Sequence, residues 1–259
     1  MPRKKCANYM CRKCKPNALA YILLAALVLI VSVRARERFT IEQTAPVRAF
    51  DGMSYRVHKQ HSDYQEAADM LAALNSRTTD IVRFLRRRYI GAPGVPPTSG
   101  RLTPARVDAV RNLLRRYNPD NLAENSPHDV TGDSSYCLDK GAVIALCLRQ
   151  RRADAKKPLG AIGAIGGAIG GAINGTDYTV VDKLHDIDTL LFVTLHELAH
   201  TAIDDVDHPP KFWSTFKFLL DEARIGGMYQ SPNFAAHPIN YCGVHVSYNP
   251  QYDNALLSI

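Results

Sequence analysis

Residues 190–204, LLFVTLHELAHTAID, are the segment that most restricts how this chain can fold. The run is almost entirely apolar, yet two histidines and a glutamate stand in its middle. A helix that is apolar on all sides has to be buried, because none of its faces suits solvent. Asp186 or Asp188 can cap its start, and the acids that follow Ile203 disfavour a longer helix. The sequence therefore predicts a buried helix at the centre of the domain.

The polar residues of this helix have the spacing His-Glu-x-x-His. Positions four apart share one helix face about 6 Å apart, so His196 and His200 can bind one ion. Glu197 is rotated by ~100° from His196, where it can take a proton from a metal-activated water. Burying such side chains costs free energy unless they are used, and a chance match has a probability of about 1%. The alternative is two structural histidines hydrogen-bonded to Asp204 or Asp205.

A catalytic zinc site needs a third protein ligand beside its water. His208 follows His200 by eight residues and Glu222 follows it by twenty-two. A glutamate on a second helix is the thermolysin-like solution, whereas a histidine in the acidic turn is more compact and suits Zn²⁺. We expect His208 to be the ligand, with Phe212 and Trp213 packing the next helix onto the first, and keep Glu222 as the alternative.

HELAH, a histidine in a short acidic turn and KFW together resemble the WLM family of minimal zinc metallopeptidases, relatives of the SprT-like group. Over roughly residues 62–250, five segments are similar to WLM-like proteins of large DNA viruses: RRYNPDNLAENSP, DKGAVIALCLR, LLFVTLHELAHTAID, HPPKFWSTFKFLLDEA and NYCGVHV. Many members place the third histidine closer to the second than it lies here. The resemblance implies that His196, His200 and His208 bind Zn²⁺ and that Glu197 is the general base.

The resemblance also implies a fold and a reaction. The fold class is α+β: a small zincin-like metallopeptidase domain over residues 61–259, with helices, a short antiparallel sheet and an active-site helix carrying HELAH. The reaction is zinc-dependent hydrolysis of peptide bonds in a protein or peptide substrate. The alternative is a catalytically inactive, metal-stabilised, membrane-tethered binding module. Oligomeric state is not readable from the sequence.

Local patterns predict further elements of this domain. They are helices over 61–75, 78–90 and 103–117, a helix from Pro209-Pro210 to Gly226-Gly227, and two strands within 135–150. The strand near 142–148 can align an extended substrate by edge pairing. Glycine recurs every four residues within 158–176, which reads either as a flexible surface insertion or as a close-packing glycine zipper.

The stretch 18–33, ALAYILLAALVLIVSV, contains no charged residue. As a helix it spans about 24 Å, short of a hydrocarbon core of about 30 Å, and flanking basic side chains can cover the difference. The sequence predicts a basic cytosolic tail (1–16), a transmembrane signal anchor (17–34) and a linker with one short strand (35–60). This makes a single-pass membrane protein with a cytosolic N-terminus; a cleaved signal peptide is the alternative.

The net charge of +7 is concentrated at the N-terminus. Residues 1–38 contain nine of the 32 basic residues and one of the 25 acidic residues, which leaves the body with 23 basic and 24 acidic residues, a net charge of −1. An electrostatic case for nucleic-acid binding by the body therefore fails. A factor that binds nucleic acid through the basic N-terminus is a second alternative.

The six cysteines do not define a disulfide framework by their spacing. Three lie in the basic tail and three in the body: Cys6, Cys11 and Cys14, then Cys137, Cys147 and Cys242. Cysteines beside basic residues next to a membrane are plausible acylation sites. The three in the tail are therefore either acylated or uninvolved.

Overall fold

The computed structural model describes residues 21–28, 31, 44–99, 101–125, 134–151 and 180–259. Contacts divide the chain into two units, Met1–Arg38 and Phe39–Ile259, and the elements named below belong to the second. The predicted tail over residues 1–16, with its three cysteines, and the glycine-rich insertion over 158–176 lie outside the described residues. Those predictions stay predictions.

The prediction of a transmembrane signal anchor over residues 17–34 is wrong. Among the described residues, no helix combines the length and the apolar character that crossing a bilayer requires. Within the predicted span, residues 21–28 and 31 are described as helical. The single-pass localisation and the transmembrane helix in front of the α+β domain are corrected with it, whereas the membrane as a partner stays a prediction.

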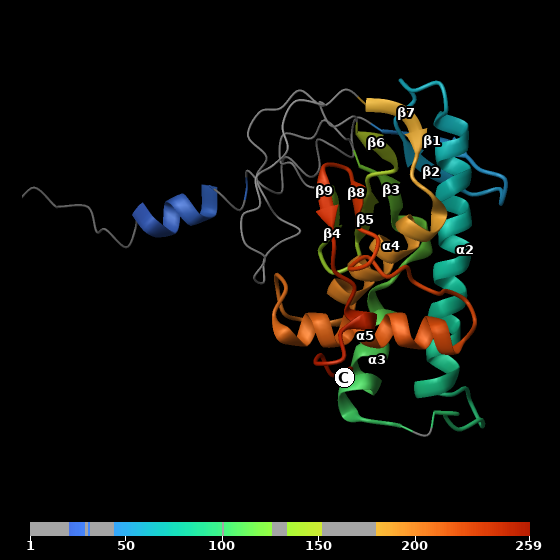
Figure 1. The fold of residues 1–259 in the computed structure, drawn as a ribbon, viewed down its shortest axis with the longest axis vertical. Helices are drawn as coiled ribbons and strands as arrows, with labels where there is room; N and C mark the ends of the chain where they lie inside the picture. Colours follow the sequence, from blue (N-terminus) through green and yellow to red (C-terminus); the bar gives the residue numbers. More distant parts are fainter. Residues whose placement is uncertain (1–20, 29–30, 32–43, 100, 126–133, 152–179) are drawn as a thin grey trace, which may run out of the picture. The chain divides into compact units, whose positions relative to one another are not determined.

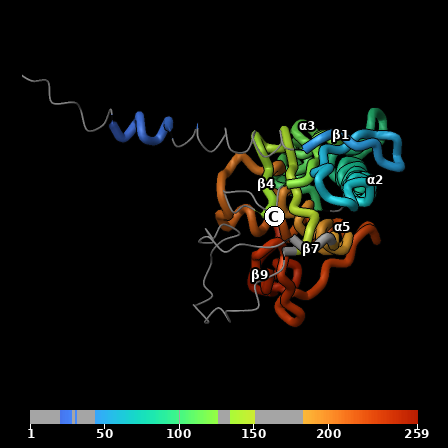
Figure 2. The backbone as a smooth tube through the Cα atoms, turned by 90° about the horizontal axis from the view of Figure 1, so that it is seen from above, coloured from blue at the N-terminus to red at the C-terminus, as the bar shows by residue number. Residues whose placement is uncertain are grey.

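A five-stranded sheet forms one layer of the second unit, in the order β1-β2-β3-β5-β4. Its strands are β1 (Ala45–Arg48), β2 (Ser54–Val57), β3 (Leu122–Glu124), β4 (Ser135–Leu138) and β5 (Val143–Leu146). In the view from above, β1 and β4 lie at opposite edges of the sheet (Figure 2). The hairpin of β1 and β2 thus places residues 45–57, predicted within a linker, in the sheet.

The sheet is mixed, which corrects the prediction of an antiparallel one. β1–β2 and β4–β5 are antiparallel pairs, but β3 runs parallel to both β2 and β5. Parallel neighbours need a long crossover connection. Between β2 and β3 that connection contains the helices α2 (Tyr64–Tyr89) and α3 (Pro104–Arg116).

The helix α4 (Ile187–Ala202) lies at the centre of the domain, as predicted. It contacts α2, α3 and α5 (Pro210–Ile225) on its helical sides and β4 and β5 on the sheet side, and Figure 1 shows it above α5 and beside α2. Every residue from Thr189 to Ala199 is buried. The side chain of Asp186 accepts a hydrogen bond from the Thr189 N–H, which confirms one of the two predicted caps.

The predicted helices over 61–75 and 78–90 are one continuous helix, α2. Asn75 interrupts the apolar pattern, but its side chain is buried, and both its amide nitrogen and its amide oxygen are hydrogen-bonded. Its Nδ2 donates to the Tyr55 hydroxyl at 2.9 Å, and the Tyr117 hydroxyl donates to its Oδ1 at 3.0 Å. Because both groups are satisfied, the asparagine can stay within the helix at little cost.

The other predicted helix boundaries are confirmed. The Thr103 hydroxyl accepts a hydrogen bond from Arg106 N at the start of α3. Pro210 is the first residue of α5, and Gly226 is its C-cap. The predicted and observed boundaries agree because capping residues, N-terminal prolines and C-terminal glycines act within one helical turn.

Two further strand pairs and two 3₁₀ turns complete the described part. They are β6 (Arg149–Arg151) with β7 (Val180–Leu184), β8 (Ile239–Tyr241) with β9 (Val244–Val246), η1 (Pro119–Asn121) and η2 (Pro250–Tyr252). A disulfide between Cys147 and Cys242 joins the segment after β5 to the turn between β8 and β9. This pair was not apparent from cysteine spacing, because 95 residues separate its members.

A buried ion-pair network holds β3, β6 and the start of α2 together. The side chains of Arg149 and Glu124 are both 0% exposed, and their Nε and Oε1 atoms are 2.8 Å apart. Arg149 also pairs with Asp63, the N-cap residue of α2. Burial raises the pKa of Glu124, and the charge of Arg149 opposes that rise. The arginine therefore stabilises a charge that would otherwise be unfavourable in the core.

Replacing Arg149 by methionine should destabilise the protein by about 3–5 kcal/mol, because it leaves the Glu124 carboxylate buried without its cation. The measurement is the free energy of unfolding from urea titrations. The matched control is Arg83→Met, which breaks an exposed pair with Asp80 and should cost less than about 1 kcal/mol. Equal losses in the two variants would show that the network does not stabilise the core.

Candidate metal centre

The turn after α4 brings a third histidine back to the helix. Ile203 ends the helical conformation, and Asp207 adopts a left-handed backbone with φ of +60° directly before His208. Pro209 then caps α5 and Pro210 begins it. This single left-handed residue contributes to the change in chain direction, and the His208 ring lies against the rings of His196 and His200 on α4.

The three imidazoles converge on one point. The Nε2 atom of His208 lies 3.1 Å from that of His196 and 3.2 Å from that of His200. One ring nitrogen can form only one such hydrogen bond, as donor or as acceptor, so hydrogen bonding alone does not account for both distances. Nitrogens bound tetrahedrally to Zn²⁺ at about 2.0–2.1 Å lie about 3.3 Å apart. The donor set and its spacing therefore fit a zinc ion.

Burial keeps these imidazoles in the form that a metal requires. Desolvation lowers the pKa of His196 well below its usual value, and the charges of the other two histidines act in the same direction. Desolvation, then the charges of His208 and Lys140, lower the pKa of His200 to about 3. Burial also lowers the pKa of His208. At neutral pH all three rings are uncharged, and neutral imidazole is the ligand form.

Aromatic side chains of α5 fix the positions of the histidines. The ring of Phe212 lies 4.8 Å from that of His196, 4.3 Å from His200 and 4.5 Å from His208, between centroids. The Trp213 ring lies 5.6 Å from that of His208. The predicted packing by Phe212 and Trp213 is confirmed, and it restricts the rotamers of the candidate ligands.

Glu197 is buried on the side of α4 that faces β4. Its side chain is 3% exposed. Burial and then the charge of Glu197 raise the pKa of Cys137, on β4, to about 11. The Cys137 Sγ lies 3.4 Å from the Thr201 hydroxyl, one turn along the same helix. The candidate general base is thus buried on the face of α4 that lies against β4.

Glu222, the alternative ligand, lies in a different cluster. It accepts a hydrogen bond from the Tyr89 hydroxyl at 2.8 Å and pairs with the Arg88 guanidinium at 2.7 Å. Among the described residues, the group able to hold a metal contains His196, His200 and His208 and not this glutamate. The position of Glu222 on α5 was predicted, but its carboxylate is used to join α2 to α5.

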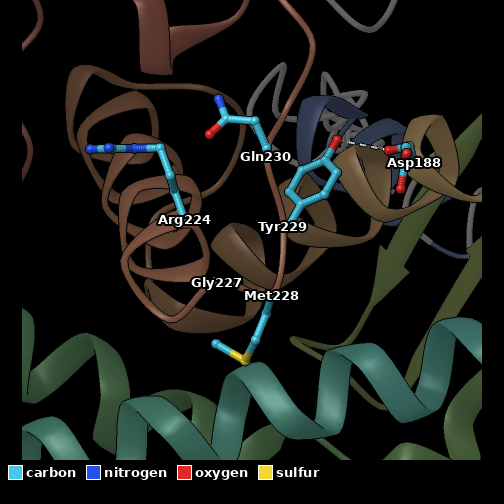
Figure 3. Close-up of a pocket in the computed structure, with 6 residues that line it drawn as sticks. All are labelled: Asp188, Arg224, Gly227, Met228, Tyr229 and Gln230. Atoms are coloured by element: carbon cyan, nitrogen blue, oxygen red, sulfur yellow. Dashed lines mark hydrogen bonds between the residues drawn. The ribbon is translucent and has the colours of Figure 1, made fainter.

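A surface pocket of about 290 Å³ lies where the start of α4 meets the end of α5, and none of the three histidines lines it. Figure 3 shows its lining, in which the Tyr229 hydroxyl donates to the backbone carbonyl of Asp188 at 2.7 Å. The Arg224 and Gln230 side chains complete its polar wall. The pocket therefore belongs to the start of α4 and the end of α5, and not to the metal centre.

Comparison with known proteins identifies two viral relatives. The chain is 25% identical over 228 residues to "Uncharacterized protein R325" of Acanthamoeba polyphaga mimivirus, a match that covers 88% of this chain and 92% of that protein. It is 43% identical over 58 residues to "Uncharacterized protein 136R" of Invertebrate iridescent virus 6, covering 22% of this chain and 32% of that protein. No family model and no solved structure matches. The resemblance to the WLM family stays a prediction.

Proposed function

We propose that this protein is a zinc-dependent metallopeptidase, with His196, His200 and His208 as metal ligands and Glu197 as general base. The observation that carries the proposal is the convergence of three imidazoles, in which the Nε2 atom of His208 lies 3.1 Å from that of His196 and 3.2 Å from that of His200. Three histidines with one position left open are a donor set of catalytic zinc sites. A buried glutamate next to the first ligand supplies the base that hydrolysis needs.

The residues of the site have separate roles in the reaction. When bound, Zn²⁺ lowers the pKa of a water to about 7 and polarises a carbonyl. Glu197 accepts the proton of the attacking water and then passes it to the leaving amine as the carbon–nitrogen bond breaks. Glu197 is buried and directly follows His196 in α4, so its carboxylate is held in place by the surrounding protein and little reorganisation is needed at the moment of transfer.

The edge strand β4 supports a peptide as the substrate. The strand near 142–148 was predicted to align the substrate, but β5 lies between β3 and β4 and has no free edge. Among the described strands, β4 is the edge strand next to β5, and it lies against α4, the helix that carries Glu197. An extended peptide can add to such an edge through main-chain hydrogen bonds. We therefore assign substrate alignment to β4.

The purified full-length protein is expected to contain about one zinc ion per chain and to cleave an unfolded protein such as casein, because the site has one set of ligands. Metal content by mass spectrometry and fragment release by gel are the measurements. A chelator should abolish cleavage, and added Zn²⁺ should restore it. A folded, metal-free protein that takes up no zinc would exclude the proposal. Zinc binding without cleavage of any tested substrate would favour an inactive, metal-stabilised binding module.

A further inference from the structure

The segment between the second and third candidate ligands has to be held in place. His200 lies on α4, and His208 follows a turn over residues 203–207. The last carbonyls of a helix have no partner within the helix, and a turn of this kind is otherwise free to move. Any shift of the turn would move the His208 ring away from the rings of α4. The contacts of this turn therefore control the geometry of the metal centre.

Arg116, the last residue of α3, makes three of these contacts. Its Nη1 donates to the carbonyl oxygen of Thr201 at 3.0 Å and to that of Ile203 at 3.2 Å. Its Nη2 donates to the carboxylate of Asp204. The arginine side chain is 17% exposed, whereas that of Asp204 is 76% exposed. One guanidinium thus satisfies two carbonyls at the end of α4 and fixes the first acid of the turn.

Neighbouring residues also restrict the movement of the turn over residues 203–207. Asn112, one turn earlier on α3, donates to the carbonyl oxygen of Ala202 at 3.0 Å. Lys140 donates to the carbonyl oxygen of Asp205 from the turn between β4 and β5. Gly141, with φ of +111°, lies so close that a Cβ there would be 2.9 Å from the Arg116 carbonyl oxygen. The end of α3 is therefore packed between the turn that joins β4 to β5 and the end of α4.

We propose that Arg116 is a positioning residue of the metal centre: by binding the end of α4 and the turn after it, it sets the position of His208 relative to His196 and His200. This inference rests on the proposed metal centre. Arginine suits the role because its planar guanidinium offers several donors in a fixed geometry. A lysine offers a point charge on a flexible stem and cannot hold three acceptors in the same way.

The test compares Arg116→Ala with Arg111→Ala, a change on the same helix that removes an exposed arginine paired with Asp108. Zinc affinity of the full chain is measured by competition with a chelating dye, and the absorption of the Co²⁺-loaded protein reports the coordination. Loss of a residue that orients a metal ligand typically weakens affinity by about 10–100-fold. We expect that loss, with a weaker Co²⁺ spectrum, for Arg116→Ala. We expect less than about a twofold change for the control.

The metal-free melting temperature separates positioning from general stabilisation. If Arg116 stabilised the metal-free and metal-bound forms equally, its removal would lower both melting temperatures and leave the affinity unchanged. A folded Arg116→Ala protein with wild-type zinc affinity therefore overturns the inference. If this variant does not fold, Arg116→Lys decides by the same measurement. A wild-type chain that binds no zinc would instead reject the proposed metal centre itself.

A second comparison uses Asp204→Ala, which removes one acceptor of Arg116 from an exposed position. It should weaken zinc binding several-fold in the wild-type background and have no further effect once Arg116 is alanine. Interacting residues give such non-additive effects, whereas independent ones add. Full additivity of the two changes would contradict a joint action on the turn.

Discussion

Replacing Glu197 by glutamine is expected to abolish peptide hydrolysis while leaving the zinc content unchanged. Glutamine has nearly the same shape but cannot accept the proton of the attacking water. Loss of a general base typically reduces the rate by about 10²–10⁴-fold. The measurement is kcat/KM on a fluorogenic peptide, with zinc stoichiometry determined on the same samples. Metal retention matters because it shows that the three imidazoles still converge without the carboxylate.

The matched control is Glu66→Gln, an exposed carboxylate in the first turn of α2. It makes the same chemical change outside the site and should leave kcat/KM within about twofold, as surface substitutions have small effects. If Glu197→Gln hydrolysed peptides at the wild-type rate, Glu197 would not be the base. If neither the wild type nor the variant cleaved any peptide but both bound zinc, the binding-module alternative would stand.

Part of the fold could be predicted because its signals are local. The burial of α4 follows from its composition, and its start follows from the Asp186 cap. Because His196 and His200 are four residues apart, they lie on the same face of any α-helix. The same reasoning divided α2 in two, because a polar residue such as Asn75 looks like an interruption until its partners Tyr55 and Tyr117 are known.

The rest depends on long-range pairing that no local pattern encodes. The parallel alignment of β3 with β2 is set by where the chain returns after α2 and α3. The same return leaves β4, and not β5, at the edge next to α4. A short apolar strand has the same pattern in the middle of a sheet as at its edge. The prediction that the strand near 142–148 offers a free edge is therefore wrong.

The two arginines at the end of α3 show that local patterns also fail to predict contacts near the candidate metal centre. Arg115 and Arg116 are adjacent basic residues, a pattern that is typical of a solvated helix face. Arg115 bonds to Asn112 on its own helix, whereas Arg116 turns toward the end of α4. Adjacent residues of a helix point about 100° apart, so one of them can face a neighbour while the other faces solvent. Which one does so depends on where the neighbouring helix lies.

Replacing His208 by alanine is expected to remove zinc from the purified protein, because it deletes one of three ligands. Loss of a residue that only orients a ligand costs about 10–100-fold in affinity, so loss of the ligand itself should cost more than about 100-fold. Metal content after dialysis and affinity by dye competition are the measurements. Peptide hydrolysis should be lost together with the metal and should not return at zinc concentrations that saturate the wild type.

Two control variants decide between His208 and the alternative ligand. His237→Ala removes an exposed histidine and should leave zinc binding unchanged. Glu222→Gln keeps an oxygen that can accept from Tyr89 but removes the charge that pairs with Arg88, so it should lower stability and not zinc affinity. Retention of zinc by His208→Ala with its loss in Glu222→Gln would reverse the assignment. It would require Glu222 to leave both partners and move toward α4 when the metal binds.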